Sequence, residues 1–559
     1  MSLPESIEIS APQSVNYPIP SVEDDISQWP IYKLYQERDS FTADVKDLTF
    51  RRLLHSSKKI GLHERIATVL YSERERILEN PWRVDPPDEV DFWTDIKKNL
   101  LKSSAKEDAS DEEEINQSLL KKITHRYVEE ITGNFKINTY KLARKILPVL
   151  FNTILNAVRF RKSKIQDKLK ITGSVADLRS LVKEGTVILV PTHFSNLDSV
   201  LIGWAADRIG MSAFSYGAGL NLYENKIMSY FFSKLGAYTL DRRKKNEIYL
   251  EALKSFSQLS IEKGVHTLFF PGGTRSRSGH LESRIKQGLL GTVIDAQGNN
   301  FISGRNTKIF IVPVVLNYHF VLEAKSLINQ HLKITGKELY LSEGKKFGFF
   351  QLFSFFREFL RNSSEIIVHF GKPMDVMGHF VNEKGESFDQ SGRKIQLSDY
   401  FFSKGSISYD RQRNEEYTKR LALKIVDRYH KENVVLSSHL VTYAAFKLFQ
   451  RSNPNRDLFE LLRLPKEERV LDYQSLENAV EKIRNQILHL AKENKLQVSE
   501  MLLRSNVSEI IKNGVENVGA FHVKKPILLV ENRTFVSQDL SLLFYYHNRL
   551  DGYDLHKHI

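Results

Sequence analysis

The spacing of hydrophobic and polar residues changes along the chain, and one part of the chain alternates between strand-like and helix-like patterns. Short apolar runs separated by helix-length segments occur at 187–190, 267–270, 309–312 and 366–370. Such runs are typical of strands buried on both faces of a sheet. The alternation therefore predicts an α/β fold over about 185–375, with a mostly parallel sheet flanked by helices.

The segments on either side have the longer period of helices. Residues 1–100 and 405–559 read mainly as helices, with one strand-like run at 527–530. Residues 103–114 are acidic and lack apolar periodicity, which predicts an exposed linker or loop and a domain boundary. We therefore predict three regions: an N-terminal helical region over 1–130, an α/β domain over 131–400, and a C-terminal, mainly helical region over 401–559.

Two further segments each allow two interpretations. Between residues 137 and 170, lysines and arginines flank an apolar stretch, 146–158, that contains Pro148. This pattern indicates a kinked amphipathic helix, which either lies in a membrane interface or packs against the core beneath solvated lysines. Residues 347–360 hold a dense group of phenylalanines. Their default interpretation is buried core, and the alternative is a surface for acyl chains or lipid.

Composition narrows the class of protein. With 559 residues, 41% of them hydrophobic and 27% charged, the chain is long enough for two or three soluble globular domains. The absence of cysteine excludes disulfides, cysteine-ligated zinc and a cysteine nucleophile, and it fits a reducing cytoplasm. The N-terminus is acidic and contains prolines, unlike a signal peptide, and no apolar run approaches the roughly 18 residues of a membrane-spanning helix. We therefore expect a cytoplasmic chain without a membrane span.

The formal net charge of +13 concerns partners rather than fold. It leaves nucleic acid, anionic lipid and phosphorylated substrates open. The basic residues are dispersed, and no nucleic-acid-binding module is recognisable in the sequence. We therefore expect no nucleic-acid partner.

Four short blocks carry the candidate chemistry, in the order Thr192–Asp198, Leu235–Arg243, Phe269–Gly279 and Ile311–Val314. In the first block, His193 follows an apolar run, and Asp198 would lie in the first turn of the next helix. A carboxylate on one ring nitrogen fixes the tautomer and raises the basicity of the other nitrogen. His193 is thus a candidate general base or, on the plainer interpretation, a histidine satisfied by a local carboxylate.

The second and third blocks supply candidate anion ligands. Guanidinium groups bind phosphate through paired hydrogen bonds, and glycines let backbone N–H groups approach an anion closely. No P-loop ending, dinucleotide fingerprint or serine-hydrolase elbow accompanies these blocks. Lys244 and Lys245, which follow the second block, fit a solvated basic turn. The candidate ligands are Arg242 and Arg243 in the second block, and Gly272, Gly273, Thr274, Arg275, Ser276 and Arg277 in the third.

In this order the blocks resemble the glycerolipid acyltransferase family, in particular the bacterial glycerol-3-phosphate acyltransferases of the PlsB type. The stretches 217–222, leading into 235–237, and 312–323 support the resemblance, which covers about 185–375. It implies an acyltransferase-type α/β domain that moves a fatty acyl group from acyl-CoA or acyl carrier protein to the first hydroxyl of glycerol 3-phosphate, giving lysophosphatidic acid. It implies no metal or redox cofactor. With the basic amphipathic segment, it also implies peripheral attachment to the anionic cytoplasmic face of the cell membrane.

The resemblance also assigns roles to residues. His193 would be the catalytic base and Asp198 its partner. Arg242, Arg275 and the loop formed by Gly273, Thr274, Arg275 and Ser276 would hold the acceptor's phosphate, and Pro313 would line the acyl or acceptor pocket. Gly272 stands where the family places a glutamate, and Glu282 is a nearby carboxylate that could substitute for it. This departure leaves open an acceptor such as dihydroxyacetone phosphate or lysophosphatidate, or a catalytically silent lipid-binding homologue.

Overall fold

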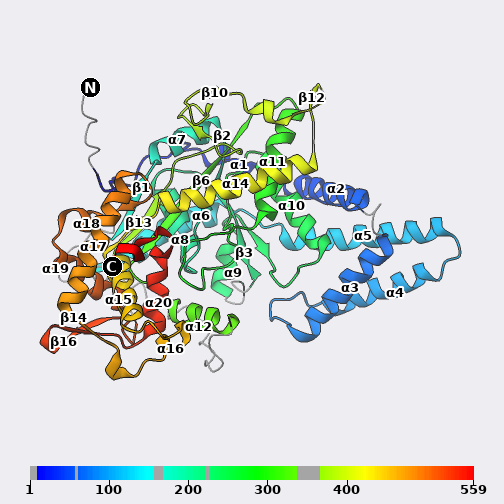
Figure 1. Cartoon of the computed structure of the whole chain (residues 1–559). Helices are drawn as coiled ribbons and strands as arrows, with labels where there is room; N and C mark the ends of the chain where they lie inside the picture. Colours follow the sequence, from blue (N-terminus) through cyan, green and yellow to red (C-terminus); the bar gives the residue numbers. More distant parts are fainter. Residues whose placement is uncertain are drawn as a thin grey trace.

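The centre of the molecule is a seven-stranded sheet in the order β1-β7-β6-β2-β5-β3-β4 (Figure 1). The computed structural model describes residues 9–56, 61–156, 166, 168–220, 223, 226–335, 365–403, 405–520 and 522–558, without the side chains of 147–156, 226–228 and 532. Neighbouring strands of the sheet run parallel, except that β6 and β7 are antiparallel. The predicted α/β fold with a mostly parallel sheet is confirmed. The strands are β1 (Leu169–Gly173), β2 (Gly185–Pro191), β3 (Ser215–Gly219), β4 (Ala237–Leu240), β5 (Thr267–Leu268), β6 (Lys308–Tyr318) and β7 (Ile366–Phe370).

Strand β2 shows why the apolar runs are continuous. Val187 and Leu189 lie in one hydrophobic cluster with residues of α8 (Asp198–Arg208), whereas Ile188 and Val190 lie in another with residues of α11 (Gln287–Ile302). Successive side chains of a strand point to opposite faces, so both sets are buried only if both faces are covered. The ends of β2 and β5 are therefore fixed from both sides, and the first and third blocks begin there.

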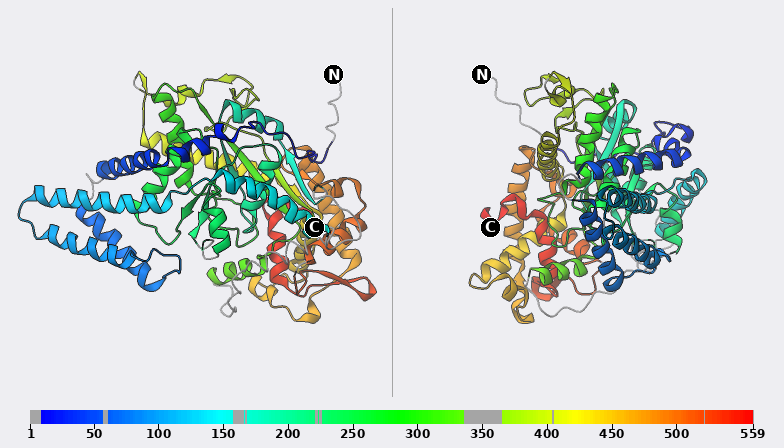
Figure 2. Two further views of the ribbon diagram at one scale, coloured as in Figure 1. Left: turned by 180° about the vertical axis from the view of Figure 1, so that it is seen from behind. Right: turned by 90° about the vertical axis from the view of Figure 1, so that its right-hand side faces the viewer.

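The N-terminal helices form a layer of their own, and a helical hairpin projects from it, as Figures 1 and 2 show from different sides. The hairpin consists of α4 (Glu89–Ser104) and α5 (Ala109–Ile131). The acidic run predicted as a linker lies at its tip and is mostly helical: Asp111 and Glu112 are in the first turn of α5, after the N-cap Asp108. Acidic side chains there interact favourably with the helix dipole. Residues 105–108 thus form the loop of the hairpin, and the rest of the run belongs to the end of α4 and the start of α5.

A second hydrophobic cluster joins these N-terminal helices to the α/β region. It combines residues of α2 (Arg38–Ser56), α3 (Leu62–Glu79) and α5 with Ile248 and Phe256 of α10 (Glu247–Glu262). The helix that follows the second block is thus packed against the N-terminal layer. The remaining helices before the C-terminal region are α1 (Pro30–Gln36), α6 (Ile137–Asn156), α7 (Val175–Glu184), α9 (Lys226–Phe232) and α12 (Ala324–Ile334).

The C-terminal helices share one hydrophobic core with the sheet. Leu440 of α15, Val480 of α17 and Leu543 of α20 belong to the same cluster as Leu189 of β2. The strand-like run predicted at 527–530 contains β16 (Leu528–Val530), which pairs with β17 (Thr534–Val536) in a small separate sheet. The helices of this region are α14 (Arg411–Lys431), α15 (Ser437–Ser452), α16 (Leu458–Leu462), α17 (Tyr473–Lys492), α18 (Glu500–Arg504), α19 (Val507–Gly519), α20 (Leu540–His547) and the 3₁₀ segment η7 (Asn548–Tyr553).

The two segments with open interpretations lie partly or wholly outside the described residues. The basic amphipathic segment begins as helix α6, on which Leu142 and Ile146 are each 45% exposed, but residues 157–165 are not described. The phenylalanine group at 347–360 is not described at all. No helix in the described part of the chain is both long and apolar enough to span a bilayer.

Candidate active site

The turn after β2 brings His193 and Asp198 together. The His193 Nδ1 lies 2.9 Å from the Asp198 Oδ2, and the same oxygen accepts the backbone N–H groups of Phe194 at 2.6 Å and Ser195 at 2.9 Å. The hydroxyl of Tyr318, at the end of β6, donates to the other carboxylate oxygen. Asp198 is fully buried at the first residue of α8. Because Nδ1 faces a carboxylate, a neutral His193 carries its proton there and leaves Nε2 as the basic nitrogen.

The third block holds the backbone of His193 on its other side. The N–H of His193 donates to Oε1 of Glu282 at 2.9 Å, and its carbonyl accepts the N–H of Ser276 at 2.7 Å. The imidazole stacks on Phe270, with ring centroids 4.0 Å apart, and the histidine side chain is 11% exposed. The ring is therefore fixed on one face and at Nδ1.

Glu282 lies directly against Gly272. A Cβ atom at position 272 would meet the Glu282 Cγ at 3.2 Å and its Oε1 at 3.3 Å. Burial raises the pKa of Glu282 to about 7. Its buried Oε2 has no hydrogen-bond partner among the described residues. A glutamate side chain at 272 would thus compete for the space that Glu282 occupies. The Glu282 carboxylate therefore lies close to the position at which the resemblance places a glutamate.

The loop of the third block uses some of its polar groups to hold its own shape. Gly273 has a φ of +75°, and its N–H donates to the carbonyl of Phe270 at 2.9 Å. The Ser276 hydroxyl donates to the carbonyl of His280 at 2.8 Å and accepts the N–H of Gly279. The N–H groups of Gly273 and Ser276 are therefore not available to an anion, in contrast to the expectation for this loop.

Arginines of the second and third blocks differ in whether they form ion pairs with the described residues. Arg275 forms an ion pair with Glu323 at 3.0 Å, and Glu323 also accepts hydrogen bonds from the Ser195 hydroxyl and the Asn196 N–H. Arg242 forms no ion pair with any described residue. Desolvation and the positive charges of Arg275 and Arg277 lower the pKa of Arg242. Mutual repulsion of this kind is relieved by a bound anion.

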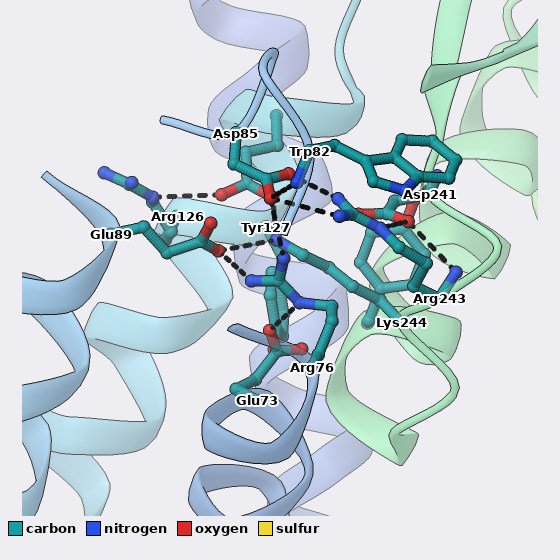
Figure 3. Close-up of polar contacts among 12 residues, drawn as sticks. Glu73, Arg76, Trp82, Asp85, Glu89, Arg126, Tyr127, Asp241, Arg243 and Lys244 are labelled. Atoms are coloured by element: carbon teal, nitrogen blue, oxygen red, sulfur yellow. Dashed lines mark hydrogen bonds and ion pairs between the residues drawn. The ribbon is translucent and has the colours of Figure 1, made fainter. Parts of the chain in front are cut away.

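Arg243 of the second block and Lys244, which follows it, form ion pairs with carboxylates near the N-terminal helices (Figure 3). Arg243 pairs with Asp241 at 2.7 Å and with Asp85, and its guanidinium lies 4.1 Å from the centre of the Trp82 ring. Lys244 is buried and pairs with Glu130 of α5. The expected solvated turn is therefore wrong for Lys244, because carboxylates of the N-terminal helices come to it.

A cavity of about 680 Å³ lies beside the third block. Thr274, Arg275 and Ser276 line it, together with residues of α12, α14 and the C-terminal segment η7. Among the described residues, its lining does not include His193, Arg242, Gly273 or Pro313. Pro313 is buried within β6 beside Val190, where its carbonyl accepts the Gly371 N–H. The structure therefore places Pro313 in the sheet rather than on this cavity wall.

Two residues lie at the site although no motif in the sequence predicts a role for them. Glu323 ends a stretch used for the family resemblance but was given no role, and Arg549 belongs to no motif. Arg549 lines the cavity, and its guanidinium lies 4.3 Å from the centre of the Phe194 ring, next to His193. No group of three or more histidine, aspartate or glutamate side chains in the described part of the chain is arranged to hold a metal ion.

Comparisons with known proteins place the α/β region of this chain near acyltransferases. Residues 173–317 match the family model described as Acyltransferase. A glycerol-3-phosphate acyltransferase of Pseudoalteromonas atlantica is 26% identical over 357 residues, 63% of this chain and 40% of the relative. One from Aeromonas hydrophila is 28% identical over 297 residues, 53% of this chain and 33% of the relative. The chain thus spans about two fifths or less of the length of these curated relatives.

Proposed function

Because the chain contains an acyltransferase domain, we propose that it transfers a fatty acyl group from a thioester to the sn-1 hydroxyl of glycerol 3-phosphate. The donor would be acyl-CoA or acyl carrier protein, and the product lysophosphatidic acid, the first intermediate of phospholipid synthesis. The names of the relatives support glycerol 3-phosphate as the acceptor. The single observation that carries the chemistry is the 2.9 Å contact between the His193 Nδ1 and the buried Asp198.

In the proposed reaction His193 acts as the general base. Its Nε2 takes the proton of the acceptor hydroxyl while the hydroxyl oxygen attacks the thioester carbonyl carbon. The tetrahedral intermediate then expels the thiolate, which receives the proton from the imidazolium. Asp198 stabilises the imidazolium through Nδ1, as a buried carboxylate does in other histidine-based acyl transfers. No covalent acyl-enzyme forms.

We assign acceptor binding to the arginines that influence one another at this site. Arg242 and Arg275 would bind the phosphate of the acceptor, with the Thr274 hydroxyl as a further donor. Gly273 and Ser276 would fix the loop that carries these groups, as their internal hydrogen bonds suggest. Pro313 would support the pocket indirectly, from its place in the sheet beside Val190 near the end of β2.

Membrane attachment is the final part of the proposal. Exposed Leu142 and Ile146 at the start of the basic amphipathic segment support a peripheral position on the anionic cytoplasmic face of the membrane. The acyl chain and the product are both poorly soluble in water, so a position at the lipid surface suits this reaction.

The test is thioester consumption with glycerol 3-phosphate, measured with and without anionic vesicles. His193→Ala and Asp198→Asn should each lower turnover by about 10³- to 10⁴-fold, because the base is lost or loses its partner. Circular dichroism should show that both variants are folded. His489→Ala, in which the replaced side chain is 62% exposed, should retain wild-type turnover. Near-normal turnover by both site variants would overturn the assignment.

The acceptor is tested in the same assay. Glycerol 3-phosphate, dihydroxyacetone phosphate and lysophosphatidate compete for one limiting thioester, and the products are separated. Glycerol 3-phosphate should be consumed first. Preference for either of the other two would change the acceptor and leave the His193 chemistry in place.

A further inference from the structure

Arg549 is a buried cation that forms no ion pair with the described residues. The residue is 6% exposed and lies in the C-terminal segment η7. Its Nε donates to Oδ1 of Asn433 at 3.0 Å, and its Nη2 donates to the carbonyl of Leu316 at 2.8 Å and to Oδ1 of Asn317 at 2.7 Å. All three acceptors are neutral. Among the described residues, no carboxylate lies within ion-pair distance of Arg549.

The environment of Arg549 leaves it charged and partly unsatisfied. Burial lowers the pKa of Arg549 to about 10, so the side chain is still protonated at neutral pH. Its Nη1 donates no hydrogen bond to the described residues, and the side chain lines the cavity beside the third block. A buried charge without a partner is unfavourable in a folded protein unless something else compensates it. Arg549 therefore brings to the cavity lining a positive charge that no described carboxylate pairs with.

The rest of the cavity wall also favours an anion. Arg275, Arg277 and Arg284 line it with Arg549, and of these four only Arg275 forms an ion pair within the described part of the chain. Glu282 is the one carboxylate among the described lining residues, and its raised pKa reduces its negative charge near neutral pH. Thr274 and Ser283 add hydroxyl groups to the lining, whereas the side chains of Ser278 and Asn548 already hydrogen-bond to His280, to His547 and to the Ser278 carbonyl. The cavity therefore presents excess positive charge and several hydrogen-bonding groups.

We propose that this cavity binds a phosphate ester and that Arg549 is its buried anchor. The planar guanidinium is held by Asn433 and Asn317, which leaves Nη1 for a phosphate oxygen, and Arg275 and Arg277 of the third block line the same cavity. The C-terminal region thus supplies a binding group to a site whose motifs all lie before residue 320.

The proposed reaction has two substrates that carry a phosphate ester, and the inference rests on the proposed function for the identity of these substrates. One is the phosphate of glycerol 3-phosphate, and the other is a phosphate of the thioester donor. Both are phosphate esters, and the contact of Arg549 with Phe194 places the anchor near the His193 turn in either case.

The experiment measures ligand binding and kinetics separately on the full chain. Calorimetry with inorganic phosphate, glycerol 3-phosphate and CoA needs no turnover, and KM is then measured for acceptor and donor. Arg549→Met should weaken binding of inorganic phosphate and of one of the two substrates by at least about tenfold. Arg549→Lys should recover part of the affinity. Arg504→Met, at a side chain 79% exposed on α18, should bind like the wild type.

Each outcome has a distinct meaning. A raised KM for glycerol 3-phosphate alone identifies the acceptor's phosphate, and a raised KM for the donor alone identifies the donor's. Unchanged affinity for phosphate and both substrates in a folded Arg549→Met variant overturns the proposal. If that variant does not fold, the same measurements are made on Arg277→Met, because this side chain lines the same cavity and forms no ion pair with described residues. Unchanged affinity in Arg277→Met would then overturn the proposal. Wild-type protein that binds phosphate at the cavity but consumes no thioester would refute the proposed function and leave the cavity proposal standing.

Discussion

The molecule contains two groups of basic side chains that differ in what neutralises them. In the first, which we call the paired cluster, Arg76, Arg243 and Lys244 contact Glu73, Asp85, Glu89, Glu130 and Asp241 (Figure 3). In the second, the arginine cavity, Arg275, Arg277, Arg284 and Arg549 face a space in which Glu282 is the one described carboxylate. The paired cluster joins the N-terminal helices to the second block, whereas the arginine cavity has room for a ligand.

A similar contrast exists between two neighbouring residues, Arg243 of the paired cluster and Arg242, which does not line the arginine cavity. The carboxylates of Asp241 and Asp85 raise the pKa of Arg243, whereas desolvation and the charges of Arg275 and Arg277 lower that of Arg242. One guanidinium is therefore stabilised by the protein itself, and the next one along the chain is destabilised. Paired charges hold a fold together, and unpaired charges of one sign gathered at a site indicate a ligand of the other sign.

Removing a cation from the paired cluster should have the largest effect on stability. Arg76→Met leaves the buried carboxylates of Glu73 and Glu89 without this partner, so we expect the free energy of unfolding to fall by about 3–5 kcal/mol. Urea denaturation measures it. Arg51→Met is the matched control, since Arg51 is 68% exposed in its pair with Asp47, and it should change stability by less than about 1 kcal/mol. Equal losses in the two variants would contradict the distinction between buried and exposed pairs.

The carboxylate of Glu282 in the arginine cavity should make the free energy of unfolding depend on pH. The pKa of Glu282 is raised to about 7 in the folded protein, so between pH 4.5 and 7 the folded state binds more protons than the unfolded state. Its contribution to stability is therefore lost as the pH rises through that range, by an amount on the order of 3 kcal/mol for a shift from 4.5 to about 7.

Glu282→Gln removes that titration. The difference in unfolding free energy, variant minus wild type, should rise between pH 4.5 and 7 and then stay level. Buried His266, whose pKa is lowered to about 4, destabilises both proteins at acid pH, so only the difference between them is informative. A difference that does not change with pH would show that Glu282 titrates normally.

Neutralising an unpaired arginine should affect binding and spare the fold, which is the smallest of the three effects. Arg242→Gln should raise the KM for glycerol 3-phosphate by about 10- to 100-fold, which corresponds to the loss of one charged hydrogen-bonding partner. The free energy of unfolding should stay constant or increase slightly, because a repulsion is removed. A loss of stability like that of Arg76→Met would place Arg242 among the structural arginines instead.

The sequence predicts the parts of this molecule that depend on neighbours close in the chain. The apolar runs of β2, β6 and β7 are recognisable because burial on both faces leaves mostly apolar side chains within them, with His369 of β7 as a buried polar exception. The contact between His193 and Asp198 is predictable because five residues of turn and helix start suffice to form it.

Contacts between distant segments were not predictable in the same way. Lys244 is buried because Glu130, 114 residues earlier, reaches it. Arg549 meets Leu316, 233 residues away, through a backbone carbonyl that leaves no trace in the amino-acid pattern. The prediction of a linker at 103–114 is wrong for most of this run for another reason. Polar composition is shared by loops and by the exposed first turns of helices.

The order of strands in the sheet also affects how the molecule reaches its native state. Strand β2 pairs with β5 and β6, and β1 pairs with β7, whose residues lie about 200 positions further along the chain. Such distant pairings form slowly, since a long loop must close before any contact is gained. Helices can form well before the sheet edge closes, and apolar strands are meanwhile exposed to other chains. We therefore expect the pairing of β1 with β7 to form late in folding, and the apolar strands to be prone to aggregation until it has formed.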